Sequence, residues 1–198
     1  MHNEVQVPEG DLLICSGDIS VYGDPFEIRE FMGWFEKQPH KYKVLILGNH
    51  DRLGQEDPTH FRSMIPSNVI YLENSGTEIE GFKIWGSPYT PEFGFWYFMG
   101  KRGEMKEHWN LIPEDTNILV THGPPHGNLG GQLSGGEDVG DMELFNRIFY
   151  LKQLKLHSFG HIHENGGKIY ERWGIKFVNA ALLDIGYNLR NNPIVVDL

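Results

Sequence analysis

The sequence has little cysteine and few basic residues, and it contains no long apolar run. Cys15 is the single cysteine among 198 residues, so the chain cannot form a disulfide framework. Seventeen lysine and arginine residues against 27 aspartate and glutamate residues give a net charge of −10, which argues against an extended nucleic-acid surface. No apolar stretch is long enough to span a bilayer, and no signal peptide is recognisable. We therefore expect a cytoplasmic protein without a membrane partner, while its oligomeric state stays open.

Several short apolar runs are followed directly by polar residues that can bind metal ions or transfer protons. The clearest run is 44–47, after which Gly48 allows a sharp turn into Asn49, His50 and Asp51. Three other apolar runs lead to Gly17-Asp18, Thr121-His122-Gly123 and Gly160-His161-Ile162-His163. Because strands of an α/β sheet direct the residues at their carboxyl ends to one edge, we expect these side chains to converge.

The first part of the chain follows a strand–helix–strand pattern. We expect a helix over residues 25–37, because Asp24 can cap it and apolar side chains recur on one face. The apolar runs on either side should pair as parallel strands. Further helices are expected over 58–65 and 142–155, a hairpin over 77–86, and strands over 68–72, 117–120, 156–159, 168–171, 176–178 and 194–196.

The polar residues at the strand ends combine carboxylate, amide and imidazole groups without a thiolate. The candidate metal ligands are Asp18, Asn49, His122, His161 and His163. Such a mixed set suits manganese, iron, zinc or magnesium in a catalytic site. In an extended segment His161 and His163 would point the same way, so that they could serve two neighbouring ions with Asp18 between them. Two divalent ions would hold a hydroxide for in-line attack on a phosphoryl group.

His50 is the candidate catalytic acid that protonates the leaving alkoxide, and Asp51 would orient its ring and raise its proton affinity. Each of these residues alone also fits a plainer explanation as a turn residue, a loop histidine or a helix cap. The aromatic-rich stretch 87–110 either stacks on a substrate or caps the core. The candidate substrate-binding residues are Asn49, His50 and Tyr89.

These motifs resemble the calcineurin-like metallophosphoesterase superfamily over almost the entire chain. Four of its five blocks are present as Gly17-Asp18, Gly48-Asn49-His50-Asp51, Thr121-His122 and Gly160-His161-Ile162-His163. The resemblance implies an α/β (α+β) fold, a four-layer αββα sandwich of two mixed β-sheets flanked by helices, as one domain over residues 1–198. It also implies a metal-dependent phosphoesterase with two divalent metal ions and a small phosphorylated substrate.

Stretches 86–91, 109–113 and 121–125 are similar to the branch of metallophosphoesterase-domain-containing, brain 239-like proteins. That branch is associated with phosphodiesterase activity on cyclic nucleotides, so the resemblance implies small phosphodiesters as substrates. Protein Ser/Thr phosphatases carry Asp-Arg-Gly where this chain has Ser20-Val21-Tyr22-Gly23. The difference disfavours phosphoproteins as substrates.

The first block of the superfamily, a buried strand ending in Asp-x-His, has no counterpart in this chain. By analogy one metal site is complete, while the other keeps only Asp18 and His163. We therefore expect the domain to be short by about one N-terminal strand, because the sequence starts at an internal methionine of a longer protein. The alternative is a catalytically impaired phosphoesterase-like fold that acts as a binding or scaffold module.

Overall fold

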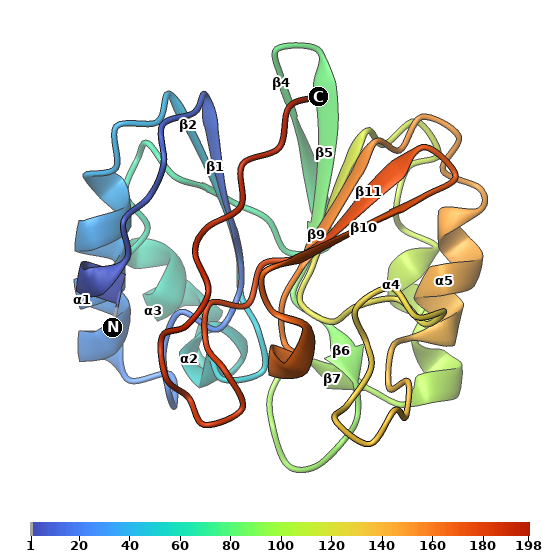
Figure 1. Cartoon of the computed structure of the whole chain (residues 1–198). Coiled ribbons are helices and arrows are strands. Elements are labelled where there is room, and N and C mark those ends of the chain that lie inside the picture. The colour runs from blue at the N-terminus through green and yellow to red at the C-terminus, as the bar shows by residue number, and fades with distance from the viewer. Residues whose placement is uncertain (1) are drawn as a thin grey trace.

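The structure is a computed structural model that describes residues 2–198, arranged in four layers (Figure 1). Two β-sheets pack together in the middle, with α1 to α3 outside one sheet and α4 and α5 outside the other. The helices are α1 (Pro25–Glu36), α2 (Arg52–Glu56), α3 (Pro58–Ser63), α4 (Lys106–Trp109) and α5 (Met142–Ile148). Within the described residues, no helix has the length and apolar character needed to cross a bilayer.

The two larger sheets differ in strand direction. One sheet has the order β1-β2-β3 and is parallel throughout, so only the six-stranded sheet, of order β10-β11-β9-β8-β5-β4, is mixed as expected. A short parallel pair, β6-β7, lies apart from both. The strands are β1 (Leu12–Ser16), β2 (Tyr42–Ile46), β3 (Ile70–Tyr71), β4 (Ser75–Ile79), β5 (Phe82–Ser87), β6 (Thr90–Pro91), β7 (Met99–Gly100), β8 (Ile118–Thr121), β9 (Leu156–Phe159), β10 (Lys168–Arg172) and β11 (Ile175–Asn179).

Helix α1 forms where its capping residues and apolar stripe predict it. The Asp24 side chain accepts a hydrogen bond from the backbone N–H of Phe26 at 2.7 Å, and Pro25 occupies the first turn. The stripe packs against β2 and consists of Ile28, Phe31, Met32 and Phe35. Each such buried side chain contributes about 1.5–3 kcal/mol to stability. Helix α1 therefore fixes β2 in the core, and β2 leads directly to Asn49.

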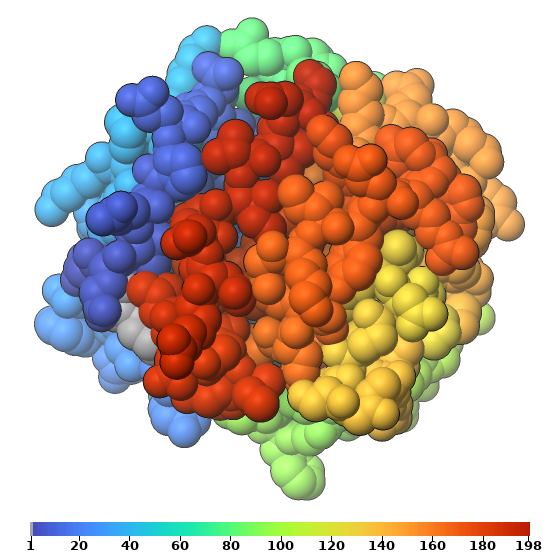
Figure 2. Space-filling model, in the orientation of Figure 1, coloured from blue at the N-terminus to red at the C-terminus, as the bar shows by residue number. Residues whose placement is uncertain are grey.

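The C-terminal segment contributes to the core without joining a sheet. Residues 194–196, expected as a strand, have no sheet assignment, so this prediction is wrong. Ile194 and Val196 nevertheless pack against the cluster between the two sheets. Alternating apolar residues identify an extended chain with one buried face, but they do not identify a hydrogen-bonding partner. Figure 2 shows this red segment on the surface between the blue N-terminal part and the orange part around β10 and β11.

Helix α5 is shorter than its apolar pattern suggests. It begins after the Asp141 cap, whose side chain accepts from the backbone N–H of Glu143 at 2.8 Å, and it ends at Ile148 instead of residue 155. Leu151 and Leu154 are buried from turns that follow the helix. The burial periodicity thus continues past the helical hydrogen bonds.

Candidate metal centre

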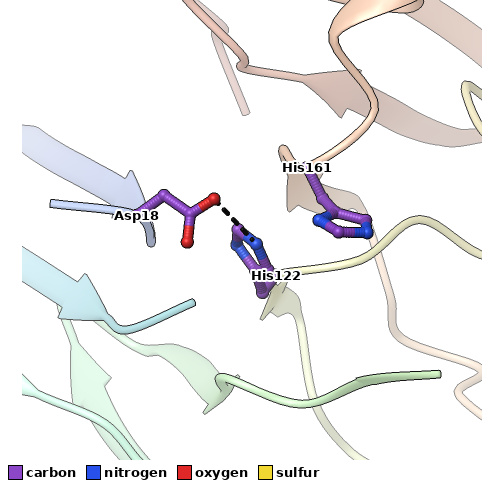
Figure 3. Close-up of side chains that lie close together, drawn as sticks. All are labelled: Asp18, His122 and His161. Carbon is purple, nitrogen blue, oxygen red and sulfur yellow. Dashed lines mark ion pairs between the residues drawn. The ribbon is translucent and has the colours of Figure 1, made fainter. Parts of the chain in front are cut away.

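Candidate ligands follow four strands whose carboxyl ends meet at one edge of the sandwich. Asp18 and Asn49 follow β1 and β2, while His122 and His161 follow β8 and β9. The side chains of Asp18, His122 and His161 point toward one another (Figure 3), with candidate ligand atoms all within 4.8 Å of each other. Asn49 joins them through its Oδ1, which lies 2.9 Å from His122 Nε2. We call Asp18, Asn49, His122 and His161 the ligand group.

The hydrogen bonds of His122 determine which of its nitrogens can bind a cation. Its Nδ1 lies 2.9 Å from the carbonyl oxygen of Ser16, which can only accept, so Nδ1 carries the proton. The other nitrogen, Nε2, lies 2.9 Å from Asn49 Oδ1 and 3.2 Å from Asp18 Oδ2. When the His122 ring is neutral, Nε2 has a free lone pair. Three electron-pair donors then lie close together, namely His122 Nε2, Asn49 Oδ1 and Asp18 Oδ2. Such a donor set fits a divalent cation.

Burial and mutual charge set the protonation of the ligand group. Burial raises the pKa of Asp18, but the His122 imidazole outweighs it, and the net pKa lies well below its usual range. For His122, burial lowers the pKa while the Asp18 carboxylate raises it, with a net increase. Burial lowers the pKa of His161 to about 3, so this imidazole stays neutral. Since metal ligands must be deprotonated, Asp18 and His161 are ready to bind.

Two glycines allow the strand ends to approach each other. A Cβ on Gly48 would overlap with Asp18 Oδ1 and with the ring of His122. Gly17 has a φ of 99°, and a Cβ there would lie 2.6 Å from the carbonyl oxygen of Leu47. Glycine is therefore needed before Asp18 and before Asn49, because the backbone behind the ligand group is too closely packed for a side chain.

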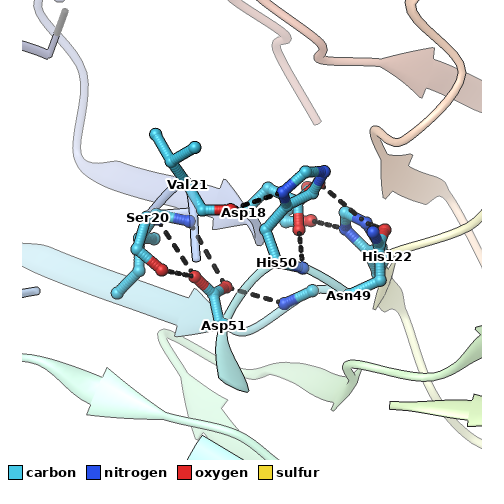
Figure 4. Close-up of polar contacts among 10 residues, drawn as sticks. Asp18, Ser20, Val21, Asn49, His50, Asp51 and His122 are labelled. Carbon is cyan, nitrogen blue, oxygen red and sulfur yellow. Dashed lines mark hydrogen bonds and ion pairs between the residues drawn. The ribbon is translucent and has the colours of Figure 1, made fainter. Parts of the chain in front are cut away.

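Asp51 has a different role from the one expected. Its Oδ1 accepts hydrogen bonds from the backbone N–H and the hydroxyl of Ser20 at 3.0 and 2.7 Å, and its Oδ2 accepts from the N–H of Gly48 and Ile19 (Figure 4). Burial, followed by the nearby Asp18 carboxylate, raises the pKa of Asp51 to about 6. The predicted orientation of the His50 ring by Asp51 is thus wrong. Asp51 instead ties the loop after β1 to the loop after β2.

His50 is held by backbone groups beside the ligand group. Its Nδ1 lies 2.7 Å from the carbonyl oxygen of Val21 and therefore donates to it (Figure 4). Its backbone N–H donates to Asp18 Oδ1 at 2.9 Å. The Val21 carbonyl accordingly fixes the imidazole, and Nε2 is the ring atom that can exchange a proton with a substrate.

His163 does not project alongside His161. The segment leaves the extended conformation at His161, whose φ is 66°, and His163 begins a 3-10 turn (His163–Asn165). The extended geometry expected for this pair is therefore wrong, although both histidines line the same cavity. The Nδ1 of His163 donates to the carbonyl oxygen of Asp184 at 3.0 Å, so Nε2 is its available ligand atom. A metal-binding role for His163 stays a prediction.

Tyr89 packs into the core. Its ring stacks on His108 with centroids 3.7 Å apart, meets Phe98 edge-on and contacts the clusters under both layers of helices. Tyr89 remains partly exposed, and its substrate contact stays a prediction. The aromatic side chains that do lie at the site are Trp96, beside His50, and Phe93, beside His161. Both belong to the aromatic-rich stretch, but an irregular loop has no periodicity that would single them out.

The side of β1 away from β2 borders a cavity of about 1070 Å³ that reaches Asp18, His122 and His161. Among the described residues, β1 pairs with β2 alone. The cavity lining includes apolar side chains of β1 and of the C-terminal segment, such as Leu12, Ile14, Ile194 and Val196. The ligand group is therefore bordered by a large space on the β1 side.

Comparisons with known proteins find relatives along almost the entire chain. Residues 2–165 match the family described as calcineurin-like phosphoesterase. Human metallophosphoesterase domain-containing protein 1 is 37% identical over 98% of this chain. A UPF0046 protein of Caenorhabditis elegans is 32% identical over 98% of the chain. The chain spans 66% of the length of the human relative and 56% of the nematode one.

A solved structure shares the fold. The crystal structure of a phosphopantetheinyl hydrolase from Mycobacterium tuberculosis superimposes with a TM-score of 0.56. The match covers 89% of this chain and 81% of that chain, at 13% sequence identity. At this identity the likeness concerns the arrangement of helices and sheets.

Proposed function

Because this chain belongs to the calcineurin-like phosphoesterase family, we propose that its ligand group supports hydrolysis of small phosphodiesters, cyclic nucleotides among them. The observation that carries this proposal is the convergence of Asp18, His122 and His161 to within 4.8 Å, beside His50. Divalent ions held there would supply a Lewis acid and an activated nucleophile for in-line displacement at phosphorus.

The residues of the chain divide the remaining work. Asp18, Asn49, His122 and His161 would hold the metal. Gly17, Gly48 and the Asp51 hydrogen bonds set the loops that carry Asp18 and Asn49. His50, whose ring is fixed by the Val21 carbonyl, would give a proton from Nε2 to the departing alkoxide. Within the ligand group Asn49 and His122 are each 1% exposed, whereas Asp18 and His161 are partly exposed and face the cavity through which a substrate would enter.

One observation favours the second candidate function, a binding or scaffold module. The compact three-residue group leaves out His163, so the ligand atoms that lie together account for a single ion. A single ion could bind an anionic phosphate without assembling the two-metal arrangement that activates a nucleophile. Metal stoichiometry therefore separates the two candidates.

The test is metal analysis of protein purified without chelators, together with hydrolysis of bis(p-nitrophenyl) phosphate and of cyclic nucleotides. The phosphodiesterase proposal expects about two ions per chain and metal-dependent turnover. Bound metal without hydrolysis of any of these diesters would overturn it in favour of the module. Turnover of bis(p-nitrophenyl) phosphate but not of cyclic nucleotides would support phosphodiester hydrolysis and exclude cyclic nucleotides as substrates.

A further inference from the structure

Aromatic rings lie beside two of the histidines at the reacting centre, His50 and His161. The ring of Trp96 lies 4.3 Å from that of His50, centroid to centroid. The ring of Phe93 meets His161 edge-on at 4.9 Å. Both side chains come from the loop between β6 and β7, which Figure 1 shows at the lower end of the sandwich. The loop thus places two aromatic side chains next to the candidate acid and a candidate ligand.

The loop is attached to the segment that carries Asn49. The backbone N–H of Tyr97 donates to the carbonyl oxygen of Asn49 at 3.2 Å. The N–H of Phe98 donates to Gln55 Oε1 at 2.5 Å, and the Tyr97 hydroxyl donates to Glu56 at 3.0 Å. These contacts with Asn49 and with α2 fix the backbone directly after Trp96. Its position is therefore preorganised and does not depend on a ligand.

Core packing does not explain these rings. Phe98 performs that role in the same loop and is 1% exposed, whereas Phe93 is 52% exposed. Across the site, Tyr22 is 68% exposed and lies nearly parallel to Trp96, with an interplanar angle of 8° and centroids 6.3 Å apart. Trp96 itself is partly buried. Its partly exposed ring, together with the exposed rings of Phe93 and Tyr22, lies beside a polar centre and suits stacking on a planar group.

We infer that Trp96, together with Phe93 and Tyr22, forms a subsite that binds a planar aromatic group of the substrate. This inference rests on the proposed function and narrows its substrate class to phosphoesters that carry a nucleobase or an aryl group. The geometry gives the reason: a phosphoryl group at the ligand group with its leaving oxygen near His50 would present the attached group to Trp96. Trp96 acts here as a specificity residue.

The experiment compares two ligands that share a phosphate and a ribose and differ only in the base. Binding of adenosine 5′-monophosphate and of ribose 5-phosphate is measured by calorimetry in the presence of Mn²⁺. Because stacking contributes about 1–3 kcal/mol per base, the wild-type protein should bind the nucleotide about 5–150 times more tightly. Trp96→Ala should remove most of this preference, and Trp96→Phe should keep most of it.

A matched control is Trp173, which is 50% exposed at the turn between β10 and β11 and packs against Phe149. Trp173→Ala should leave both affinities unchanged. Equal affinity of the wild-type protein for the two ligands, or no binding of either, would overturn the subsite. Equal weakening of both ligands by Trp96→Ala would overturn it too, because the loop would then only support the ligand group.

The outcomes also separate this inference from the proposed function. Nucleotide preference without hydrolysis of any phosphodiester would leave the subsite standing and remove the enzymatic proposal. Hydrolysis of bis(p-nitrophenyl) phosphate and cyclic nucleotides, with equal binding of adenosine 5′-monophosphate and ribose 5-phosphate, would support the enzymatic proposal and overturn the subsite. Metal content of Trp96→Ala, measured in parallel, should equal that of the wild-type protein.

Discussion

Strands β1 and β8 each deliver one residue to the ligand group, but their surroundings differ. Strand β8 lies between β5 and β9, and all four of its residues are buried. Strand β1 pairs with β2 alone among the described residues, borders the cavity of about 1070 Å³, and leaves four of its five residues partly exposed. The position of His122 is therefore set by core packing. The position of Asp18 depends more on polar contacts, from the His50 backbone and the His122 ring.

The largest effect on metal binding and turnover is expected from loss of the Asp18 carboxylate. Asp18→Asn keeps the size of the side chain but removes the charge that balances a cation. We expect loss of metal binding and a fall in phosphodiester turnover larger than the ~10–100-fold that loss of an outer-shell partner causes. Metal analysis and kinetics check this. The control Asp115→Asn, at an exposed ion pair with Lys83, should retain both properties. Full metal content in Asp18→Asn would show that the β1 side is not essential to the centre.

The next effect separates proton transfer from metal binding on the β2 side. His50→Gln removes the candidate acid while leaving the backbone N–H that donates to Asp18. We expect kcat to fall about 10²–10⁴-fold with unchanged metal content, because general-acid catalysis is lost and the ligand group is intact. Should the variant lose its metal, His50 would be a ligand and not the acid.

Core substitutions test the difference between the two strands directly. Leu119 in β8 is fully buried, so Leu119→Ala should lower the free energy of unfolding by about 2–5 kcal/mol. Ile14 in β1 is partly exposed and lines the cavity, so Ile14→Ala should cost less than half as much. Urea-induced unfolding of both variants measures the two values. Equal losses would mean that β1 is packed as tightly as β8.

Bound metal should reduce the difference in local stability between β1 and β8. A ligand at 100 times its Kd stabilises the folded state by about 2.7 kcal/mol, provided that the unfolded chain does not bind it. Because Asp18 links β1 to the ligand group, amide hydrogens of β1 should exchange faster than those of β8 without metal and slow down on addition of Mn²⁺. Hydrogen exchange measured with and without Mn²⁺ checks this. Exchange in β1 that ignores Mn²⁺ would contradict the link.

The sequence predicted the parts of the site that regular structure determines. Asp18, Asn49, His122 and His161 come together because parallel strands end at a common edge, and both the strands and their polar ends are visible as local patterns. It failed where the backbone leaves regular geometry. The left-handed conformation at His161 breaks the extended geometry on which the placement of His163 was based, and no local sequence pattern predicts this conformation.

Two other features of the site were not predictable for the same reason. Tyr89 and Trp96 belong to one aromatic-rich stretch, and only the tertiary hydrogen bonds of the loop decide which ring reaches the site. The role of Asp51 likewise depends on a contact with Ser20, which is 31 residues away in the chain. Periodicity and short motifs describe neighbouring residues along the chain, so they do not reveal such pairings.

The last effect concerns a buried polar contact behind β8 and is small near neutral pH. The Thr121 hydroxyl donates to the Gly123 carbonyl, so His157 Nε2 must donate to Thr121 Oγ1, which leaves His157 Nδ1 buried without a hydrogen-bond partner among residues 2–198. A proton on Nδ1 would lack an acceptor, and burial lowers the pKa of His157 to about 3. The unfolded chain takes up this proton near pH 6.5 and the folded protein does not, so stability falls as pH drops through this window.

Because of His157, the free energy of unfolding should fall by about 1.4 kcal/mol for each pH unit as the pH drops from 6.5 toward 3. His157→Gln can keep a donor toward Thr121 and does not titrate. Its stability should therefore decline less steeply than that of the wild-type protein below pH 6.5, as measured by urea unfolding at a series of pH values. Parallel profiles would show that His157 is protonated in the folded protein. In that case the buried region around β8 would accommodate a protonated His157. Strands β1 and β8 would then differ only in how tightly they are packed.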